Sequence, residues 1–180
     1  AGFTGTPNVA LLVRTKTLQK NNIALVGPLT GADSLRAAHG TEEHKAEQGN
    51  YQLGADTMTE GHIPQLFHVR AGYSDEARKI VKQAVSLGMQ KIGVLYSDDA
   101  FGKTGLAAIN EALKEHKLQL ASKGIYSAKT GDISDAVKNI SAARPQAVIM
   151  LANTTPAGNF IKQYRQIDPG AQLFALSTVS

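Results

Sequence analysis

The sequence predicts an α/β fold with a mainly parallel sheet flanked by helices. Short apolar runs typical of buried strands alternate with longer segments that have helical periodicity. Several of these runs break into a polar loop that opens a helix, which is the repeating unit of doubly wound sheets. Right-handed crossovers between successive strands then place helices on both faces of the sheet.

Five apolar runs are predicted to be strands. The first covers residues 23–27 and has the composition of a buried strand. The others cover residues 66–70, 91–96, 147–152 and 173–176. His68 alternates within the second run and is expected to be a packed or edge histidine. Because parallel sheets bind ligands at the carboxyl ends of their strands, function is expected in the loops that follow.

Four segments of helical periodicity lie between these strands. In residues 75–87 the apolar side chains recur at intervals of three and four, and Gly88 is expected to end the helix. Similar patterns predict helices over residues 102–116, 133–143 and 156–167. Each predicted helix can cover one face of the sheet with its apolar side.

Composition narrows the class of protein. The 180 residues are 42% hydrophobic, enough for one domain or two small lobes with a buried core. No apolar run approaches the roughly 18 residues of a membrane span, and residues 1–4 do not have the pattern of a signal peptide. The absence of cysteine excludes disulfides and thiolate chemistry. The net charge of +4 is scattered, so nucleic-acid binding is not expected.

Residues 97–104 follow a predicted strand and open a helix, as a phosphate-binding P-loop would. Ser97, however, stands where the motif requires its first glycine. The carboxylates of Asp98 and Asp99 would also repel phosphate oxygens. A nucleotide-binding enzyme is therefore the least favoured function.

Metal and catalytic patterns are weak. A cluster of two histidines and two glutamates invites a metal interpretation, but Gly40 stands where a second histidine would complete a zinc-binding helix motif. A solvated loop explains the cluster better. No nucleophile elbow or Ser, His and Asp grouping occurs, so no catalytic residue, cofactor or metal site is predicted. The cluster consists of His39, Glu42, Glu43 and His44.

Hydroxyl and small residues recur at four predicted junctions between loops and helices. Helix starts present backbone N–H groups and a partial positive charge, which suit a ligand carboxylate. Each junction taken alone is better explained as a helix cap. Several gathered at one sheet edge would define a crevice. The junctions are Thr4-Gly5-Thr6-Pro7, Thr30-Gly31-Ala32, Tyr73-Ser74-Asp75 and Asn153-Thr154-Thr155-Pro156.

In residues 27–36, 67–77 and 91–102 the chain resembles the periplasmic substrate-binding proteins of branched-chain amino acid ABC transporters, the leucine/isoleucine/valine-binding family. The resemblance implies the type I periplasmic binding fold, whose two Rossmann-like lobes close on a hinge around a ligand. It also implies a non-catalytic protein without a cofactor, a periplasmic or extracellular location, and a membrane permease as partner. An extracellular ligand-sensing domain of a receptor with the same fold is the alternative.

The resemblance also assigns candidate ligand contacts. Thr6 matches the first hydroxyl-bearing loop of the family, and Thr30, Gly31 and Ala32 match the second. In the family these loops meet the carboxylate of the ligand with hydroxyls and backbone amides. The chain is therefore expected to use the same four residues for an amino acid or a similar small carboxylate.

Four further candidates follow from the resemblance. Ser74 falls at or beside a polar contact of the family, and Phe101 matches an aromatic residue that lines the pocket. Thr154 and Thr155 stand before a proline where branched-chain amino acid binders usually place a tyrosine. The acidic group expected near the last strand is not apparent in residues 177–180. A ligand other than leucine, isoleucine or valine is therefore compatible with the sequence.

The resemblance finally predicts a domain organisation. Residues 1–74 are expected to form a partial first lobe with an insertion at about 37–62, residues 75–176 the second lobe, and residues 177–180 the start of a hinge. Residues 54–58 echo residues 31–35, by local duplication or by chance. A partial lobe exposes apolar surface and strand edges. We therefore expect either a piece of a longer protein or a chain that pairs with another.

Overall fold

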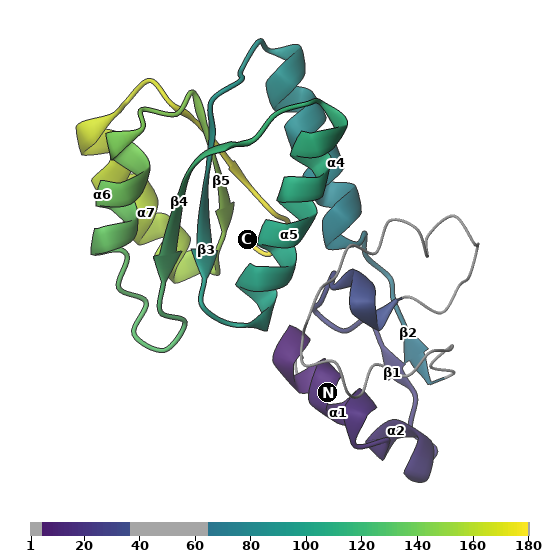
Figure 1. Ribbon diagram of the computed structural model, residues 1–180. Helices are drawn as coiled ribbons and strands as arrows, with labels where there is room; N and C mark the ends of the chain where they lie inside the picture. Colours follow the sequence, from purple (N-terminus) through teal and green to yellow (C-terminus); the bar gives the residue numbers. More distant parts are fainter. Residues whose placement is uncertain (1–4, 37–64, 180) are drawn as a thin grey trace. The chain divides into compact units, whose positions relative to one another are not determined.

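The computed structural model of the protein describes residues 5–36 and 65–179. The chain divides into two compact units, Ala1–Gly72 and Tyr73–Ser180, called the first and second unit below. The predicted insertion, its echo of residues 31–35 and the histidine and glutamate cluster lie outside the described residues. The predicted α/β class is confirmed, because both units contain parallel strands and helices (Figure 1).

The first unit places helices beside a two-stranded sheet (Figure 1). β1 and β2 pair in parallel, with Leu25 opposite Leu66 and Val26 opposite Phe67. Val9, Val13 and Leu18 of the helices are buried together with Leu66. The elements are α1 (Thr6–Arg14), α2 (Thr17–Lys20), β1 (Leu25–Val26), the 3-10 helix η1 (Asp33–Leu35) and β2 (Leu66–Phe67).

The expectation of a buried strand over residues 23–27 is wrong. The strand is limited to β1, and Ile23 and Val26 are 51% and 66% exposed. A continuous apolar run is typical of a parallel strand covered on both faces. Here Val26 and its partner Phe67 lie on a face that no described element covers. Pairing of this unit with another chain remains a prediction.

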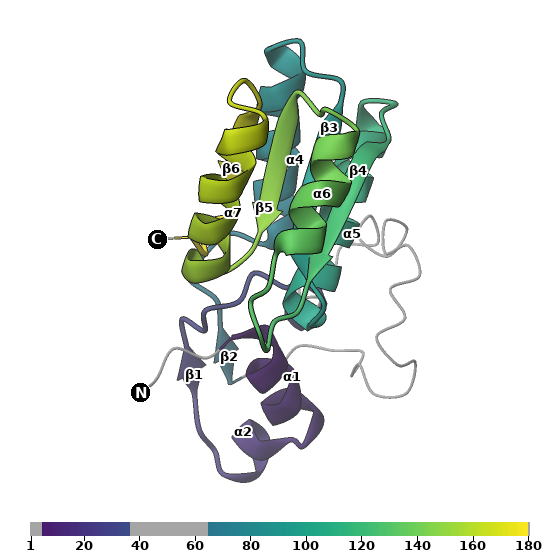
Figure 2. The same ribbon diagram turned by 90° about the vertical axis from the view of Figure 1, so that its left-hand side faces the viewer.

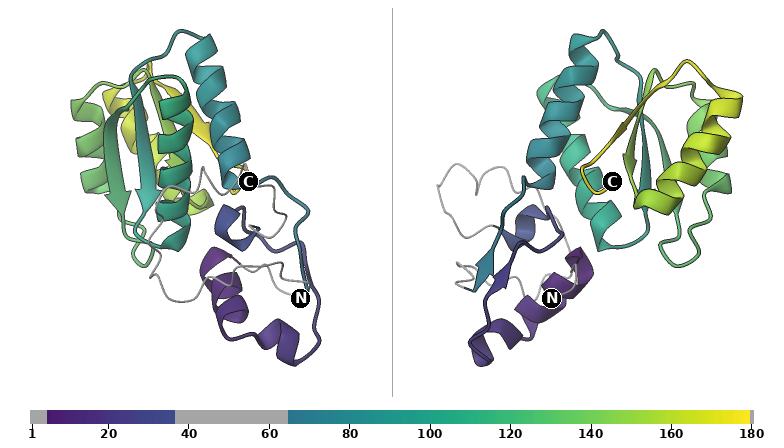
Figure 3. Two further views of the ribbon diagram at one scale, coloured as in Figure 1. Left: turned by 45° about the vertical axis from the view of Figure 1, so that its right-hand side comes forward. Right: turned by 180° about the vertical axis from the view of Figure 1, so that it is seen from behind.

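The second unit is a four-stranded parallel sheet in the order β4-β3-β5-β6. α4 and α5 pack together on one face, and α6 and α7 lie on the other (Figures 1 and 2). Figure 3 shows the same layers from behind. The elements are α4 (Tyr73–Ser86), β3 (Ile92–Ser97), α5 (Ala100–Glu115), β4 (Leu120–Tyr126), α6 (Ser134–Ala142), β5 (Ala147–Leu151), α7 (Thr154–Ile167) and β6 (Gln172–Ala175).

Most predicted elements of the second unit are confirmed within two residues at each end. β5 is buried along its whole length, as its unbroken apolar run indicates. α4 ends as expected, because Gly88 adopts the left-handed conformation with φ of 78°. In the described part of the chain, no helix is long and apolar enough to cross a membrane.

β4 is a strand that the sequence analysis does not predict. Its residues alternate between exposed positions and partly or fully buried ones at the edge of the sheet, so they form no apolar run. Lys123 and Gly124 also interrupt the pattern. Gly124 is required there, because a β-carbon would lie 2.8 Å from the backbone of Ala136 in α6. The close approach of α6 to the sheet therefore explains the glycine.

Gly102 permits a second close approach, between α5 and β3. A β-carbon on Gly102 would lie 2.1 Å from the carbonyl oxygen of Ser97 and 2.5 Å from its nitrogen. Both atoms belong to the backbone, so neither can move without shifting β3 or α5. The start of α5 is thus fixed to the end of β3 by the absence of a side chain.

Gly102→Ala is expected to lower the free energy of unfolding by about 1–3 kcal/mol, because the added methyl overpacks a rigid contact. Gly158→Ala is the matched control, since Gly158 lies in α7 with no atom near its missing β-carbon. That change should raise stability by roughly 0.5–1 kcal/mol through helix propensity. Urea unfolding followed by circular dichroism measures both. Equal stability of the Gly102 variant and the unchanged protein would contradict the close approach.

Candidate functional site

Three of the candidates in the first unit form one buried hydrogen-bonded cluster. The hydroxyl oxygens of Thr6 and Thr30 lie 2.7 Å apart. The backbone N–H of Ala32 donates to the Thr30 hydroxyl over 3.2 Å. Thr6 is 4% exposed and Thr30 is fully buried, as are Gly31 and Ala32. The structure thus brings together the two loops that the sequence analysis selected separately.

The start of α1 explains the position of Thr6. α1 begins at Thr6 itself, with Gly5 as the preceding cap residue and Pro7 in the first turn. Gly5 carries no side chain that could accept hydrogen bonds from the first-turn amides. Backbone N–H groups at such a start favour a negatively charged group. The hydroxyl of Thr6 therefore lies at a helix start suited to an anion.

The short helix η1 follows the Thr30 loop and is attached to β2 by His68. The Nε2 atom of His68 lies 3.1 Å from the carbonyl oxygen of Leu35. Burial lowers the pKa of His68 below its ordinary value of 6.5, and the nearby Arg36 lowers it further, while the hydrogen bond to Leu35 raises it. His68 is partly buried, in agreement with the expected packed or edge histidine.

The second-unit candidates fall into two pairs. Ser74 lies in the first turn of α4, next to Tyr73, whose ring meets that of Phe101 edge to face with 5.4 Å between centroids. Phe101 is 7% exposed. Thr154 and Thr155 are exposed and begin α7, on the other face of the sheet. Ser74 is therefore the chain neighbour of the residue that contacts Phe101, and the two threonines begin a helix on the opposite face of the sheet.

The carboxylates of Asp98 and Asp99 hold the loop after β3. Asp99 caps α5, accepting from the N–H of Gly102 over 3.0 Å and from the hydroxyl of Ser97 over 2.6 Å. Asp98 accepts from the N–H of Ala128 over 2.9 Å. In a P-loop the amides at this helix start would bind phosphate. Here the Asp99 carboxylate already takes one of them, which further disfavours a nucleotide site.

The sequence analysis missed two features near the carboxyl ends of the strands in the second unit. The carboxylate of Glu76 accepts from the N–H and the hydroxyl of Ser177, over 2.7 and 2.8 Å. An acidic group therefore does lie beside Ser177, the second residue after β6. No sequence signal links two residues that are 101 positions apart. Tyr126 is also buried near these strand ends, and burial raises its pKa, although hydrogen bonds with Asn153 and Ser97 oppose the shift.

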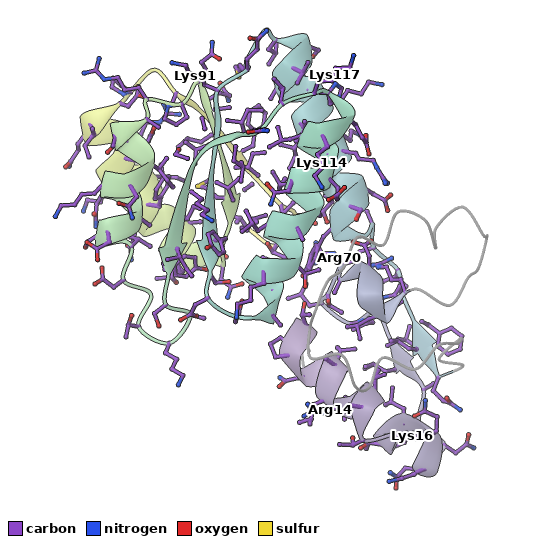
Figure 4. The ribbon with its side chains drawn as sticks, in the orientation of Figure 1. Arg14, Lys16, Arg70, Lys91, Lys114 and Lys117 are labelled. Atoms are coloured by element: carbon purple, nitrogen blue, oxygen red, sulfur yellow. The ribbon has the colours of Figure 1, made fainter. Side chains whose placement is uncertain are left out.

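Cationic side chains mark helix ends in both units. Arg14 lies in the last turn of α1 and Lys114 in the last turn of α5, and both are labelled in Figure 4. Positive charge at these positions complements the helix dipole. Lys114 also pairs with Glu111 at 2.6 Å. Among residues 5–36 and 65–179, no three His, Cys, Asp or Glu side chains are grouped as metal ligands.

Comparison with known proteins gives a family match over almost the whole chain. A profile described as a periplasmic binding protein matches residues 4–179. A substrate-binding periplasmic protein from Ralstonia solanacearum is 32% identical, with a TM-score of 0.79, over 98% of this chain and 43% of that one. This chain therefore spans less than half the length of that protein. Comparison with curated protein sequences gives no match.

Two further structures share the fold. A possible leucine/isoleucine/valine-binding protein from Rhodopirellula baltica SH 1 is 22% identical, with a TM-score of 0.77, over 98% of this chain and 42% of that one. A solute-binding protein of an ABC transporter from R. palustris, in complex with benzoate, is 16% identical, with a TM-score of 0.70, over 92% of this chain and 40% of that one. At these identities the likeness concerns the fold alone.

The lowered pKa of His68 predicts that the protein loses stability in mild acid. Because the folded state holds the His68 proton more weakly than the unfolded state, the free energy of unfolding should fall as the pH drops below 6.5. Urea unfolding between about pH 7.5 and about pH 5.5 measures this slope. In His68→Gln, which retains a donor for the Leu35 carbonyl, the slope should be shallower. Identical slopes in the two proteins would contradict the assignment.

Proposed function

Because this chain belongs to the periplasmic binding protein family, we propose that it is a non-catalytic solute-binding protein that delivers an amino acid or a similar small carboxylate to an ABC transporter. The observation that carries this proposal is the buried cluster of Thr6, Thr30 and Ala32 at the start of α1. Buried hydroxyls beside a helix start without a side-chain cap suit a carboxylate.

The chemistry of the two threonines supports this assignment. A threonine hydroxyl donates one hydrogen bond and accepts up to two. A carboxylate oxygen can therefore take the hydrogen that Thr6 and Thr30 now share, while the Thr30 oxygen keeps its bond from Ala32. Hydrogen bonds to a charged group are worth about 1.5–3 kcal/mol, more than the neutral bond they replace. Exchange of partners would thus favour the bound ligand.

We propose a separate set of ligand contacts on the second unit. Ser74 supplies a hydroxyl, and Phe101 supplies apolar surface supported by Tyr73. Thr154 and Thr155 supply exposed hydroxyls at the start of α7. Threonines in place of a family tyrosine agree with a ligand other than a branched-chain amino acid. Benzoate, present in a complex of similar fold, is one carboxylate to test.

The proposed partner is the membrane permease of the transporter, and the proposed location is the periplasm or the cell exterior. Both follow from membership of the family rather than from any contact in the structure. An extracellular sensory domain would use the same ligand contacts with a different partner. Binding of the purified protein to a permease, measured with and without ligand, would separate these two functions.

Thr6→Val is expected to weaken carboxylate binding by about 1–3 kcal/mol, through loss of a buried hydroxyl. Thr30→Val should do the same and also lose stability, because it removes the acceptor of the Ala32 N–H. Thr30→Ser keeps the hydroxyl and should bind like the unchanged protein. A thermal-shift titration with leucine, isoleucine, valine, benzoate and ATP with magnesium identifies the ligand, and calorimetry then measures its affinity.

Thr15→Val is the matched control, since Thr15 is an exposed threonine at the end of α1 in the same unit. It should leave the affinity unchanged. Unaltered affinity in both Thr6→Val and Thr30→Val would refute the proposed contacts. Stabilisation by ATP alone would contradict the proposed function, and its loss in Lys103→Ala would then favour the nucleotide alternative.

A further inference from the structure

Arg36 joins the Thr30 loop to a distant part of the first unit. Its Nη2 atom donates to the carbonyl oxygen of Thr30 over 3.4 Å and to that of Ala71 over 3.2 Å. Thr30 and Ala71 are 41 positions apart, and Ala71 is the penultimate residue of the unit. One guanidinium nitrogen therefore bridges two backbone segments that β1 and β2 lead into.

A neighbouring contact ties the same two segments together. His68 lies 3.1 Å from the carbonyl of Leu35, the residue before Arg36. Each of the two segments therefore contributes one side chain that contacts a backbone carbonyl of the other. Arg36 contacts the carbonyl of Ala71, and His68 contacts that of Leu35. Arginine suits this position because its guanidinium stays charged at all accessible pH values and presents donors in a rigid plane.

The bridge acts directly on a proposed ligand contact. The Thr30 residue that accepts from Arg36 through its carbonyl also holds Thr6 and Ala32 through its hydroxyl. Fixing the carbonyl fixes the peptide plane after Thr30, and the branched side chain of threonine has few rotamers for a given backbone. We propose that Arg36 is a positioning residue that sets the orientation of the Thr30 hydroxyl.

This proposal rests on the proposed function only in taking Thr30 as a ligand contact. The positioning itself is a property of the chain without ligand, so it is tested without one. Hydrogen exchange of single amides separates a local effect from a general loss of stability. The informative amides are those of Thr30, which donates to Pro28, and Ala32, which donates to the Thr30 hydroxyl.

Two amides of the same unit serve as internal controls. The N–H of Leu25 donates to Gln65 and that of Gly27 donates to Phe67, both across the β1–β2 pair. In Arg36→Gln, the amides of Thr30 and Ala32 should exchange about tenfold faster, because a charge-assisted bond that restrains the loop is lost. The amides of Leu25 and Gly27 should keep their rates.

Arg14→Gln is the matched control variant, since Arg14 lies at the end of α1 in the same unit (Figure 4). It should leave all four exchange rates unchanged. Arg36→Lys keeps the charge but not the planar fork, so it should also speed exchange at Thr30 and Ala32 alone. Unchanged rates in both Arg36 variants would overturn the proposal. Equal acceleration at all four amides would also overturn it, because Arg36 would then only stabilise the unit.

Discussion

Every α-helix begins with backbone N–H groups that have no partner within the helix, and this constraint organises the polar chemistry of the protein. α5 satisfies it internally, because Asp99 accepts from the third residue of the helix. α6 is served similarly by Asp132, which accepts from the N–H of Ser134. α1 follows Gly5, which has no side chain to offer. The first residue of α1, Thr6, belongs to the pair of buried threonine hydroxyls.

The parts of the fold that the sequence predicts are those with a repeated physical signal. β3 and β5 lie in the middle of the sheet and read as unbroken apolar runs, and α4 shows helical spacing with a glycine stop. β4 carries no such signal, because an edge strand alternates and tolerates Lys123. The sequence of β1 does contain an apolar run, but such a run is buried only when other elements cover both faces of the strand. Whether a strand is buried depends on the elements packed against its faces, and these cannot be read from the strand's own residues.

The structure joins the candidate residues of two separate loops in the first unit, and their role as ligand contacts remains a prediction. Family resemblance selected Thr6 and Thr30, and the structure adds the hydrogen bond between them. The family profile and the structures of similar fold confirm the resemblance and its type I periplasmic binding fold. The contact of Glu76 with Ser177 could not be foreseen, because it depends on how α4 and the end of β6 meet. The contacts of Arg36 likewise depend on tertiary structure.

The aromatic contact between Tyr73 and Phe101 gives the protein a built-in optical reporter. The sequence contains five tyrosines and no tryptophan, so no indole emission obscures that of the phenols. Among the tyrosines that the structure describes, Tyr73 is one of the most deeply buried, and its ring contacts that of a proposed ligand contact. A solute that displaces the Phe101 ring alters the surroundings of this fluorophore directly. Binding at the proposed contact Phe101 would then be followed by tyrosine emission, without attaching a dye.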